Sequence, residues 1–225
     1  MIVFDKVTKV FANGDKAIDE VSFAIEPKEF VFITGRSGAG KTTLLRLMMR
    51  EFLPTTGKIL VDKEDIVGLQ AKKLPELRRK IGAVWQDFKL LWDRTVGENI
   101  GLTLEILGHE EKEIVKHVRQ LLELVGMSNK EDLFPAQISG GELQRTVIAR
   151  ALASKPKILF ADEPTGNLDE ITAMQIMKLL KDINELGTTV LVATHNEALV
   201  EKLGKRKLTL EKGKLIVDEG TDGKK

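Results

Sequence analysis

The chain has 225 residues, with 35 basic and 34 acidic side chains and a formal net charge of +1 at pH 7. This near balance lacks the basic footprint of a nucleic-acid-binding protein, so we expect no nucleic-acid partner. Cysteine is absent, which excludes disulfides and thiolate metal sites. No apolar run approaches the roughly 20 residues of a membrane helix, and the first residues do not resemble a signal peptide. We therefore expect a cytoplasmic protein with no membrane span of its own.

The first 34 residues predict short β-strands separated by turns. Residues 21–25 alternate between apolar and polar side chains, and Asn13-Gly14 is a turn signal. Residues 30–34 form an apolar, β-prone run, and residues 58–61 predict one further strand. The beginning of the chain is therefore expected to form a β region.

The apolar run at 30–34 leads directly into a glycine-rich loop, and residues 43–52 after it have the apolar spacing of a helix. The loop reads Gly35-Arg36-Ser37-Gly38-Ala39-Gly40-Lys41-Thr42, a complete G-x-x-x-x-G-K-[ST] motif. Backbone N–H groups in such a loop, together with the helix N-terminus, bind phosphate. We expect the loop and Thr43 to bind a nucleoside triphosphate, with Lys41 on the β- and γ-phosphates and the Thr42 hydroxyl on Mg²⁺.

The middle of the chain changes to helical patterning. Apolar side chains follow helical spacing over residues 110–125, and Gly126 is a typical helix end. We expect a helical insertion near residues 90–155.

A second helix in this region begins with an unusual pair of glycines. Ser139 and Glu142 have the spacing of a capping box, which predicts a helix running to about Ala153. The capping box does not explain Gly140 and Gly141, which lower helix stability. They also expose backbone N–H groups. Because the chain already has one phosphate loop, we expect the segment 139–142 to meet a phosphate bound to another molecule.

Two apolar runs, 158–161 and 190–193, predict buried strands, and a helix over 170–186, ended by Gly187, is expected between them. Asp162 and Glu163 follow the first strand, and His195 follows the second. These are the strand ends where α/β sheets bind ligands. We expect Asp162 to bind Mg²⁺, Glu163 to act as general base for the attacking water, and His195 to bond the γ-phosphate and position that water.

Together these motifs resemble the nucleotide-binding subunits of ABC transporters, over residues 1–218. The family order and spacing are present in Gly35 to Thr42, Gln86, Ser139-Gly140-Gly141-Glu142, Ile158 to Glu163 and His195, with Asn167-Leu168-Asp169 in the place of the family's D-loop. The resemblance implies an α/β fold, in which a P-loop NTPase (ABC ATPase) core has an N-terminal antiparallel β subdomain and an inserted helical subdomain. It predicts one domain over 1–220, with the α/β core and β subdomain at 1–86 and 156–220, the helical subdomain at about 87–155, and a polar tail at 221–225.

The resemblance also implies how the site is assembled. Two identical chains would bind head to tail and hold two ATP molecules, each between the phosphate loop of one subunit and the segment 139–142 of the other. Lys41, Gln86, Glu163 and His195 would be the catalytic residues, and Thr42, Gln86 and Asp162 would hold Mg²⁺. Phe11 would stack on adenine, and Gln86 would also communicate with a membrane partner.

Within the family, the chain resembles the FtsE-type cell-division ATPases, which pair with an integral membrane protein of the FtsX type. Two stretches carry this resemblance, Gln86 to Val96 and Ala161 to Asp169. The second is shared with lipoprotein-release and macrolide-efflux ATPases, which are the alternative assignment, whereas Asp93-Arg94-Thr95 favours the FtsE type. The resemblance implies a peripheral location at the cytoplasmic face of the cell membrane and a role in cell division and cell-wall remodelling.

Four residues depart from the family pattern. Lys28 and Arg50 stand where relatives often have glycine, and Ile138 replaces a common leucine. Because none of these three contacts phosphate, we expect local backbone consequences only. Glu142 stands where glutamine is common, and its carboxylate would repel a γ-phosphate. We therefore predict that Glu142 folds back onto the start of its own helix.

Other functions are also considered. Asn129-Lys130-Glu131-Asp132 matches the guanine-reading N-K-x-D pattern of GTPases, but it follows a helical segment rather than a buried strand, so we interpret it as a polar loop. An ABC ATPase acting on DNA or ribosomes would need long insertions or a second cassette. A non-enzymatic, ATP-gated adaptor would not need Glu163 as a base, so steady ATP turnover distinguishes the enzyme from the adaptor.

The segment after Gln86 has two interpretations. Phe88, Leu90, Leu91 and Trp92 are four large apolar side chains in a predicted loop. They either anchor the loop in the core or form a docking patch for a cytoplasmic helix of the partner.

Overall fold

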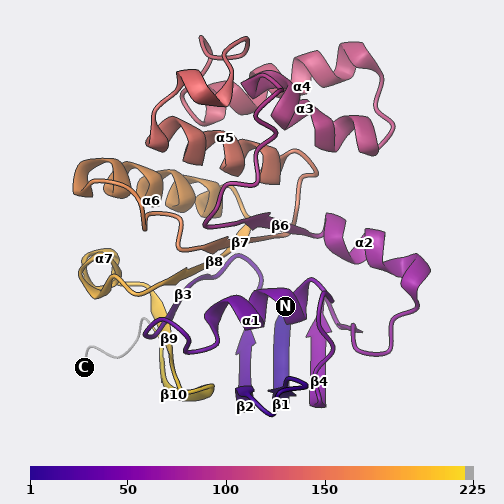
Figure 1. The fold of residues 1–225 in the computed structure, drawn as a ribbon, viewed down its shortest axis with the longest axis vertical. Helices are drawn as coiled ribbons and strands as arrows, with labels where there is room; N and C mark the ends of the chain where they lie inside the picture. The colour runs from indigo at the N-terminus through magenta and orange to yellow at the C-terminus, as the bar shows by residue number, and fades with distance from the viewer. Residues whose placement is uncertain (221–225) are drawn as a thin grey trace.

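The computed structural model describes residues 1–220. Two β-sheets and the helices around them are arranged in layers, and the helical region at one end of the molecule lies farthest from the smaller sheet (Figure 1).

The smaller sheet is antiparallel and lies at the opposite end of the molecule from the helical region (Figure 1). Its strands pair in the order β2-β1-β4-β5. Their bounds are β1 (Ile2–Val10), β2 (Lys16–Ile25), β4 (Thr56–Val61) and β5 (Glu64–Asp65). This sheet is the predicted antiparallel β subdomain.

The larger sheet has the strand order β10-β9-β3-β8-β7-β6. Its pairings are parallel except for β10, which is antiparallel to β9. Because parallel strands point the same way, the carboxyl ends of β3, β7 and β8 meet at one edge. The bounds are β3 (Phe30–Thr34), β6 (Ile81–Val84), β7 (Ile158–Asp162), β8 (Thr189–Thr194), β9 (Arg206–Glu211) and β10 (Lys214–Glu219).

Helices connect the strands and cover the sheet (Figure 1). In the described part of the chain none of them has both the length and the apolar character needed to cross a bilayer. Their bounds are α1 (Lys41–Met48), η1 (Ala71–Lys73), α2 (Leu74–Arg79), α3 (Val96–Ile106), α4 (Glu111–Leu124), η2 (Pro135–Gln137), α5 (Gly140–Leu152), α6 (Glu170–Glu185) and α7 (Glu197–Leu203).

Side chains on the central strands alternate between two hydrophobic cores. On β3, Phe30 and Phe32 belong to the core that includes side chains of α3 to α6, whereas Val31 and Ile33 belong to the core that includes side chains of α1 and the smaller sheet. Since successive strand residues point to opposite faces, a strand covered on both faces must be apolar throughout. This explains why β7 and β8 appear in the sequence as continuous apolar runs.

The helix after the phosphate loop differs from its predicted bounds of 43–52, because it begins at Lys41 and ends at Met48. It ends just before Arg50, which has a left-handed φ of 56°. The Arg50 guanidinium donates hydrogen bonds of 2.7 Å to the carbonyls of Ile66 and of Val67. Lys28 is also left-handed, with a φ of 68°. The expected local backbone consequence at the two glycine-favouring positions is therefore confirmed.

Of the four large apolar residues after Gln86, two belong to the core and two are exposed, and a docking role for the exposed pair remains a prediction. Leu90 is buried and Phe88 packs against the same core. Leu91 and Trp92, in contrast, are 40% and 58% exposed. The predicted tail at 221–225 lies outside the described residues, and the subdomain boundaries near 87 and 155 remain predictions.

Candidate active site

The glycine-rich loop joins the end of β3 to the start of α1. Gly40, the residue before α1, has a left-handed φ of 110°. A Cβ atom there would lie 2.7 Å from the carbonyl oxygen of Ala17, so only glycine fits. Lys41 is buried, and its Nζ donates hydrogen bonds to the carbonyls of Gly35, at 2.7 Å, and Arg36, at 3.3 Å. The loop therefore wraps around the lysine ammonium at the N-terminus of α1.

A pocket of about 600 Å³ opens beside this loop, a size typical of small-molecule sites. The structure brings together in it residues that are distant in sequence. Its predicted lining residues are Phe11, Ser37 to Thr43, Gln86, Asp162, Glu163 and His195. Gly35 and Arg36 do not line it, but they contact Lys41 through their carbonyls.

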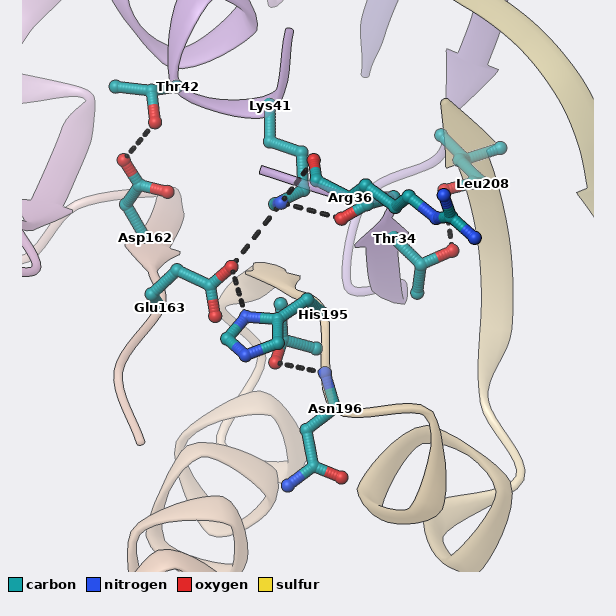
Figure 2. Close-up of polar contacts among 11 residues, drawn as sticks. Thr34, Arg36, Lys41, Thr42, Asp162, Glu163, His195, Asn196 and Leu208 are labelled. Carbon is teal, nitrogen blue, oxygen red and sulfur yellow. Dashed lines mark hydrogen bonds and ion pairs between the residues drawn. The ribbon is translucent and has the colours of Figure 1, made fainter. Parts of the chain in front are cut away.

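Thr42 and Asp162 meet at the base of this site. The Thr42 hydroxyl donates a 2.7 Å hydrogen bond to Oδ2 of Asp162 (Figure 2). The second carboxylate oxygen, Oδ1, is buried and has no hydrogen-bond partner among the described residues. Burial raises the pKa of Asp162, and the hydrogen bond from Thr42 opposes that rise. A hydroxyl beside a buried carboxylate with a free oxygen matches the all-oxygen ligand set that Mg²⁺ prefers.

Glu163 lies between Lys41 and His195 (Figure 2). Its Oε1 lies 3.3 Å from Nζ of Lys41 and 3.0 Å from Nδ1 of His195. Its Oε2 is buried and has no hydrogen-bond partner in the described chain. The backbone at Glu163 is left-handed, with a φ of 48°, and its N–H donates to the carbonyl of Ala193 at 2.8 Å. One oxygen of the carboxylate is thus fixed, and the other can accept a proton.

Phe11 lies at the side of the pocket, just after β1. Its ring makes an edge contact with Phe52, with centroids 5.2 Å apart, and Nζ of Lys9 lies 5.2 Å from its centroid. Lys16 and Lys212 also line the pocket, although neither was a candidate from the sequence. No motif contains these two lysines, so only the fold shows that they are near the loop.

The segment 139–142 does not line the nucleotide pocket of its own chain. The backbone N–H and the hydroxyl of Ser139 both donate to Oε2 of Glu142, at 2.8 and 2.9 Å. Nζ of Lys130 lies 3.3 Å from the other carboxylate oxygen. The hydrogen bonds from Ser139 hold the pKa of Glu142 below its usual value. The prediction that Glu142 folds back onto its own helix start is confirmed.

The two glycines of this segment have different surroundings. Gly140 is exposed, and a Cβ atom on it would lie 3.5 Å from Leu168. Gly141 is buried, and a Cβ atom on it would lie only 2.5 Å from the methyl group of Thr172 on α6. Packing of α5 against α6 therefore requires glycine at 141, which is a role that the sequence did not reveal.

The N-K-x-D match lies between α4 and η2. Glu131 pairs with Arg119 at 3.3 Å, and Lys130 pairs with Glu142. No residue of 129–132 lines the nucleotide pocket. The structure agrees with the interpretation of this segment as a polar loop.

Comparisons with known proteins agree with this geometry. Residues 18–166 match the family model described as ABC transporter. The chain is 46% identical over 219 residues to the cell division ATP-binding protein FtsE of Bacillus subtilis, covering 97% of this chain and 96% of that protein. It is 45% identical to FtsE of Escherichia coli K12, covering 96% of this chain and 97% of that protein.

Solved structures give the same result. A dimeric structure of MJ0796, a bacterial ABC transporter cassette, is 37% identical with a TM-score of 0.89, and covers 99% of this chain and all of that one. A post-hydrolysis dimer of the same cassette, bound to ADP and Pi, is 36% identical with a TM-score of 0.89 over the same shares of the two chains. The chain therefore belongs to the ABC transporter ATPase family and, within it, to the FtsE group of cell division ATP-binding proteins.

Proposed function

We propose that two copies of this chain close head to tail around two ATP molecules and drive an FtsX-type membrane protein from the cytoplasmic face of the membrane, in cell division and cell-wall remodelling. One observation carries this proposal. The nucleotide pocket is lined by the phosphate loop and by three strand-end residues, but by no residue of the segment 139–142. A helix start with two glycines is therefore available for a nucleotide on a second copy. The dimeric structures of MJ0796 support this arrangement.

In the proposed site, the loop amides and Lys41 hold the phosphates. Lys41 would exchange the carbonyls of Gly35 and Arg36, and the carboxylate of Glu163, for phosphate oxygens. Thr42 and Asp162 would hold Mg²⁺ together with Gln86, which lines the same pocket. When bound, the ion would neutralise phosphate charge. Phe11 would stack on the adenine ring.

Glu163 is proposed to take the proton of the attacking water on Oε2, the oxygen that has no hydrogen-bond partner among residues 1–220. The water oxygen forms the new bond to the γ-phosphorus while the bond to the β-phosphate oxygen breaks, which releases ADP and phosphate. His195 contacts Glu163 through Nδ1, and its other ring nitrogen would bond the γ-phosphate. The partner subunit's Ser139 and the partner subunit's Gly141 would complete the site with further donors.

The composite site is tested by dimer formation with ATP. Glu163→Gln should bind ATP without turning it over, so that its dimer can be measured by sedimentation. Adding Ser139→Arg should abolish the ATP-dependent dimer and leave nucleotide binding to the monomer intact. Ser128→Arg, an equally large change at an exposed serine of the same helical region, is the matched control. A dimer that survives Ser139→Arg would contradict the composite site.

The proposed docking site for the membrane partner is a groove of about 410 Å³ between α2 with β6 on one side and α3 with α5 on the other. Its apolar lining includes Trp85 and Ile106, and Ile106 is 75% exposed. Its charged lining residues are all basic, namely Arg78, Arg79, Lys89 and Arg150. These side chains fit a cytoplasmic helix that has apolar and acidic residues.

Docking is tested by co-purification with the FtsX-type membrane protein of the same cell. Ile106→Glu should abolish co-purification because it places a charge on the apolar wall of the groove. Leu186→Glu is the matched control, since Leu186 is 74% exposed but lies at the end of α6, away from the groove. Equal loss with both variants would argue against the groove as the docking site.

A further inference from the structure

Between Gln86 and Leu90 the backbone makes a turn that contains two consecutive left-handed residues. Phe88 has a φ of 58° and Lys89 a φ of 51°. This region is disfavoured for residues other than glycine, and bulky side chains adopt it only when the surroundings hold them there. Phe88 is fixed on one side by packing against the core of α3 to α6. The turn therefore depends on its contacts rather than on its own backbone preference.

Arg150, in the last turn of α5, supplies two of these contacts. Its Nη1 donates a 2.6 Å hydrogen bond to the carbonyl of Lys89, and its Nη2 donates a 2.7 Å hydrogen bond to the carbonyl of Phe88. This guanidinium is half-buried, and burial lowers its pKa. The planar fork of an arginine matches two neighbouring carbonyls, a geometry that lysine cannot reproduce. One side chain thus holds both left-handed residues.

The turn separates the two cavities described above. Gln86 lines the nucleotide pocket, whereas Trp85 and Lys89 line the docking groove. Arg150 lines the groove as well. An acidic group entering the groove would therefore compete with the two backbone carbonyls for the same guanidinium. Release of the carbonyls would free the turn that carries Gln86.

We propose that Arg150 is a positioning residue, which sets the place of Gln86 in the nucleotide pocket through the carbonyls of Phe88 and Lys89, and through which an occupant of the groove changes ATP turnover. The second part rests on the proposed function, because it uses the docking groove and the role of Gln86. The first part concerns the chain alone. It is independent of any partner.

A double-mutant cycle on the ATPase activity of the chain alone tests the first part. Arg150→Ala and Gln86→Ala should each lower kcat, by between about twofold and a hundredfold, the range that coupled neighbours show. The double variant should be no slower than Gln86→Ala, because removal of Arg150 has no further effect once Gln86 is absent. Effects that multiply in the double variant would overturn the proposal.

Arg145 provides the matched control on the same helix. Its Nη1 donates a 2.8 Å hydrogen bond to the carbonyl of Val125, and its Nη2 donates to the side chain of Gln175. Arg145 therefore also holds a backbone carbonyl, but not one of the turn. Any effect of Arg145→Ala on kcat should multiply with that of Gln86→Ala. If Arg145→Ala and Arg150→Ala combine with Gln86→Ala in the same way, the effect is one of general stability and the proposal is overturned.

Arg150→Lys keeps the experiment informative if Arg150→Ala does not fold. Lysine keeps the charge but loses the fork, so we expect an intermediate kcat, and Arg150→Lys combined with Gln86→Ala should be no slower than Gln86→Ala alone. The second part is tested with the membrane partner present. The Arg150→Lys variant should still co-purify with the partner, but the partner should no longer stimulate its ATP turnover. Retained stimulation would overturn the coupling role, whereas loss of co-purification with Ile106→Glu and Leu186→Glu alike would count against the docking groove instead.

Discussion

The hydroxyl of Thr42 donates a 2.7 Å hydrogen bond to Oδ2 of Asp162, and this contact joins the start of α1 to the end of β7 across 120 residues of sequence. It exists because β3 and β7 lie in one parallel sheet with only β8 between them, so that their carboxyl ends meet. The contact leaves Oδ1 of Asp162 buried and without a hydrogen-bond partner in the part of the chain that the structure describes. The sheet therefore brings together a hydroxyl and a carboxylate from two distant segments, the pair that we propose as Mg²⁺ ligands.

Removal of this hydroxyl should weaken Mg²⁺ binding. Thr42→Val loses a ligand and leaves both oxygens of Asp162 without a partner, so we expect the Mg²⁺ concentration for half-maximal ATP hydrolysis to rise roughly tenfold or more. Thr42→Ser keeps the hydroxyl and should stay within about twofold of the natural chain. Titration of phosphate release with Mg²⁺ measures both. An unchanged Mg²⁺ requirement in Thr42→Val would remove this residue from the ion site.

Replacement of the proposed base should separate binding from chemistry. Glu163→Gln removes the proton acceptor and should lower kcat by about 10²–10⁴. Nucleotide binding should persist, because the loop and Lys41 are untouched. Phosphate release and binding of a fluorescent ATP analogue measure the two effects. Glu185→Gln, at an exposed position of α6, is the control. Normal turnover by Glu163→Gln would exclude Glu163 as the base.

The close approach of α5 to α6 predicts a specific pair of stability changes. Gly141→Ala places a Cβ atom 2.5 Å from the Thr172 methyl group, and overpacking of this kind costs about 1–3 kcal/mol. Thr172→Ser removes that methyl group and should restore most of the loss. Gly140→Ala should be tolerated, because its new atom meets only Leu168 at an ordinary 3.5 Å. Thermal unfolding measures all three, and no rescue by Thr172→Ser would refute the packing explanation.

Glu142 predicts a pH dependence of stability. The backbone N–H of Ser139, its hydroxyl and Lys130 hold the pKa of Glu142 below its ordinary value of 4.5. Because the folded pKa is lowered, the stabilisation is complete above the ordinary value and is lost as pH falls through the folded one. Glu142→Gln keeps a capping-box side chain but does not titrate. The difference in unfolding temperature between the two proteins should therefore shrink on acidification below about pH 4.5. A constant difference would contradict this explanation.

Lys28 and Arg50 predict opposite outcomes for the same substitution. The hydrogen bonds of Lys28 with Thr189 and Asn184 use its backbone and not its side chain. Its N–H donates to Thr189, and its carbonyl accepts from Asn184. Lys28→Gly should therefore relieve left-handed strain and stabilise the chain by up to about 1 kcal/mol. Arg50→Gly relieves similar strain but loses three side-chain hydrogen bonds, so it should be neutral or destabilising. Denaturant unfolding measures both, and a destabilised Lys28→Gly would contradict the strain assignment.

The parts of the site that were predictable from sequence are those with local signals. The phosphate loop has fixed spacing between a strand and a helix, and Asp162, Glu163 and His195 directly follow apolar runs that are buried on both faces. The capping box of Ser139 and Glu142 was predictable because both partners lie within one helical turn. In each case a functional residue lies next in sequence to the strand that positions it, or within one helical turn of the residue that it contacts.

The remaining features depend on contacts that have no local pattern. Nothing near Arg150 in the sequence indicates that its partners are the carbonyls of residues 61 and 62 positions earlier. Left-handed Phe88 and Lys89 have side chains that argue against such a backbone, so propensity predicts the wrong conformation. The sequence around Gly141 predicts only a phosphate-binding role, because the methyl group of Thr172 meets this glycine only after α5 and α6 pack.

The length of α5 has a mechanical consequence. The helix has 13 residues, or about 20 Å at 1.5 Å per residue, with Ser139 before its first turn and Arg150 in its last. A tilt of about 10° around its middle would move each end by about 1.7 Å, in opposite directions. That distance is enough to break a hydrogen bond at one end while closing another contact at the opposite end. If α5 tilts as a rigid body, Ser139 at the proposed subunit boundary and Arg150 at the proposed docking groove would move together.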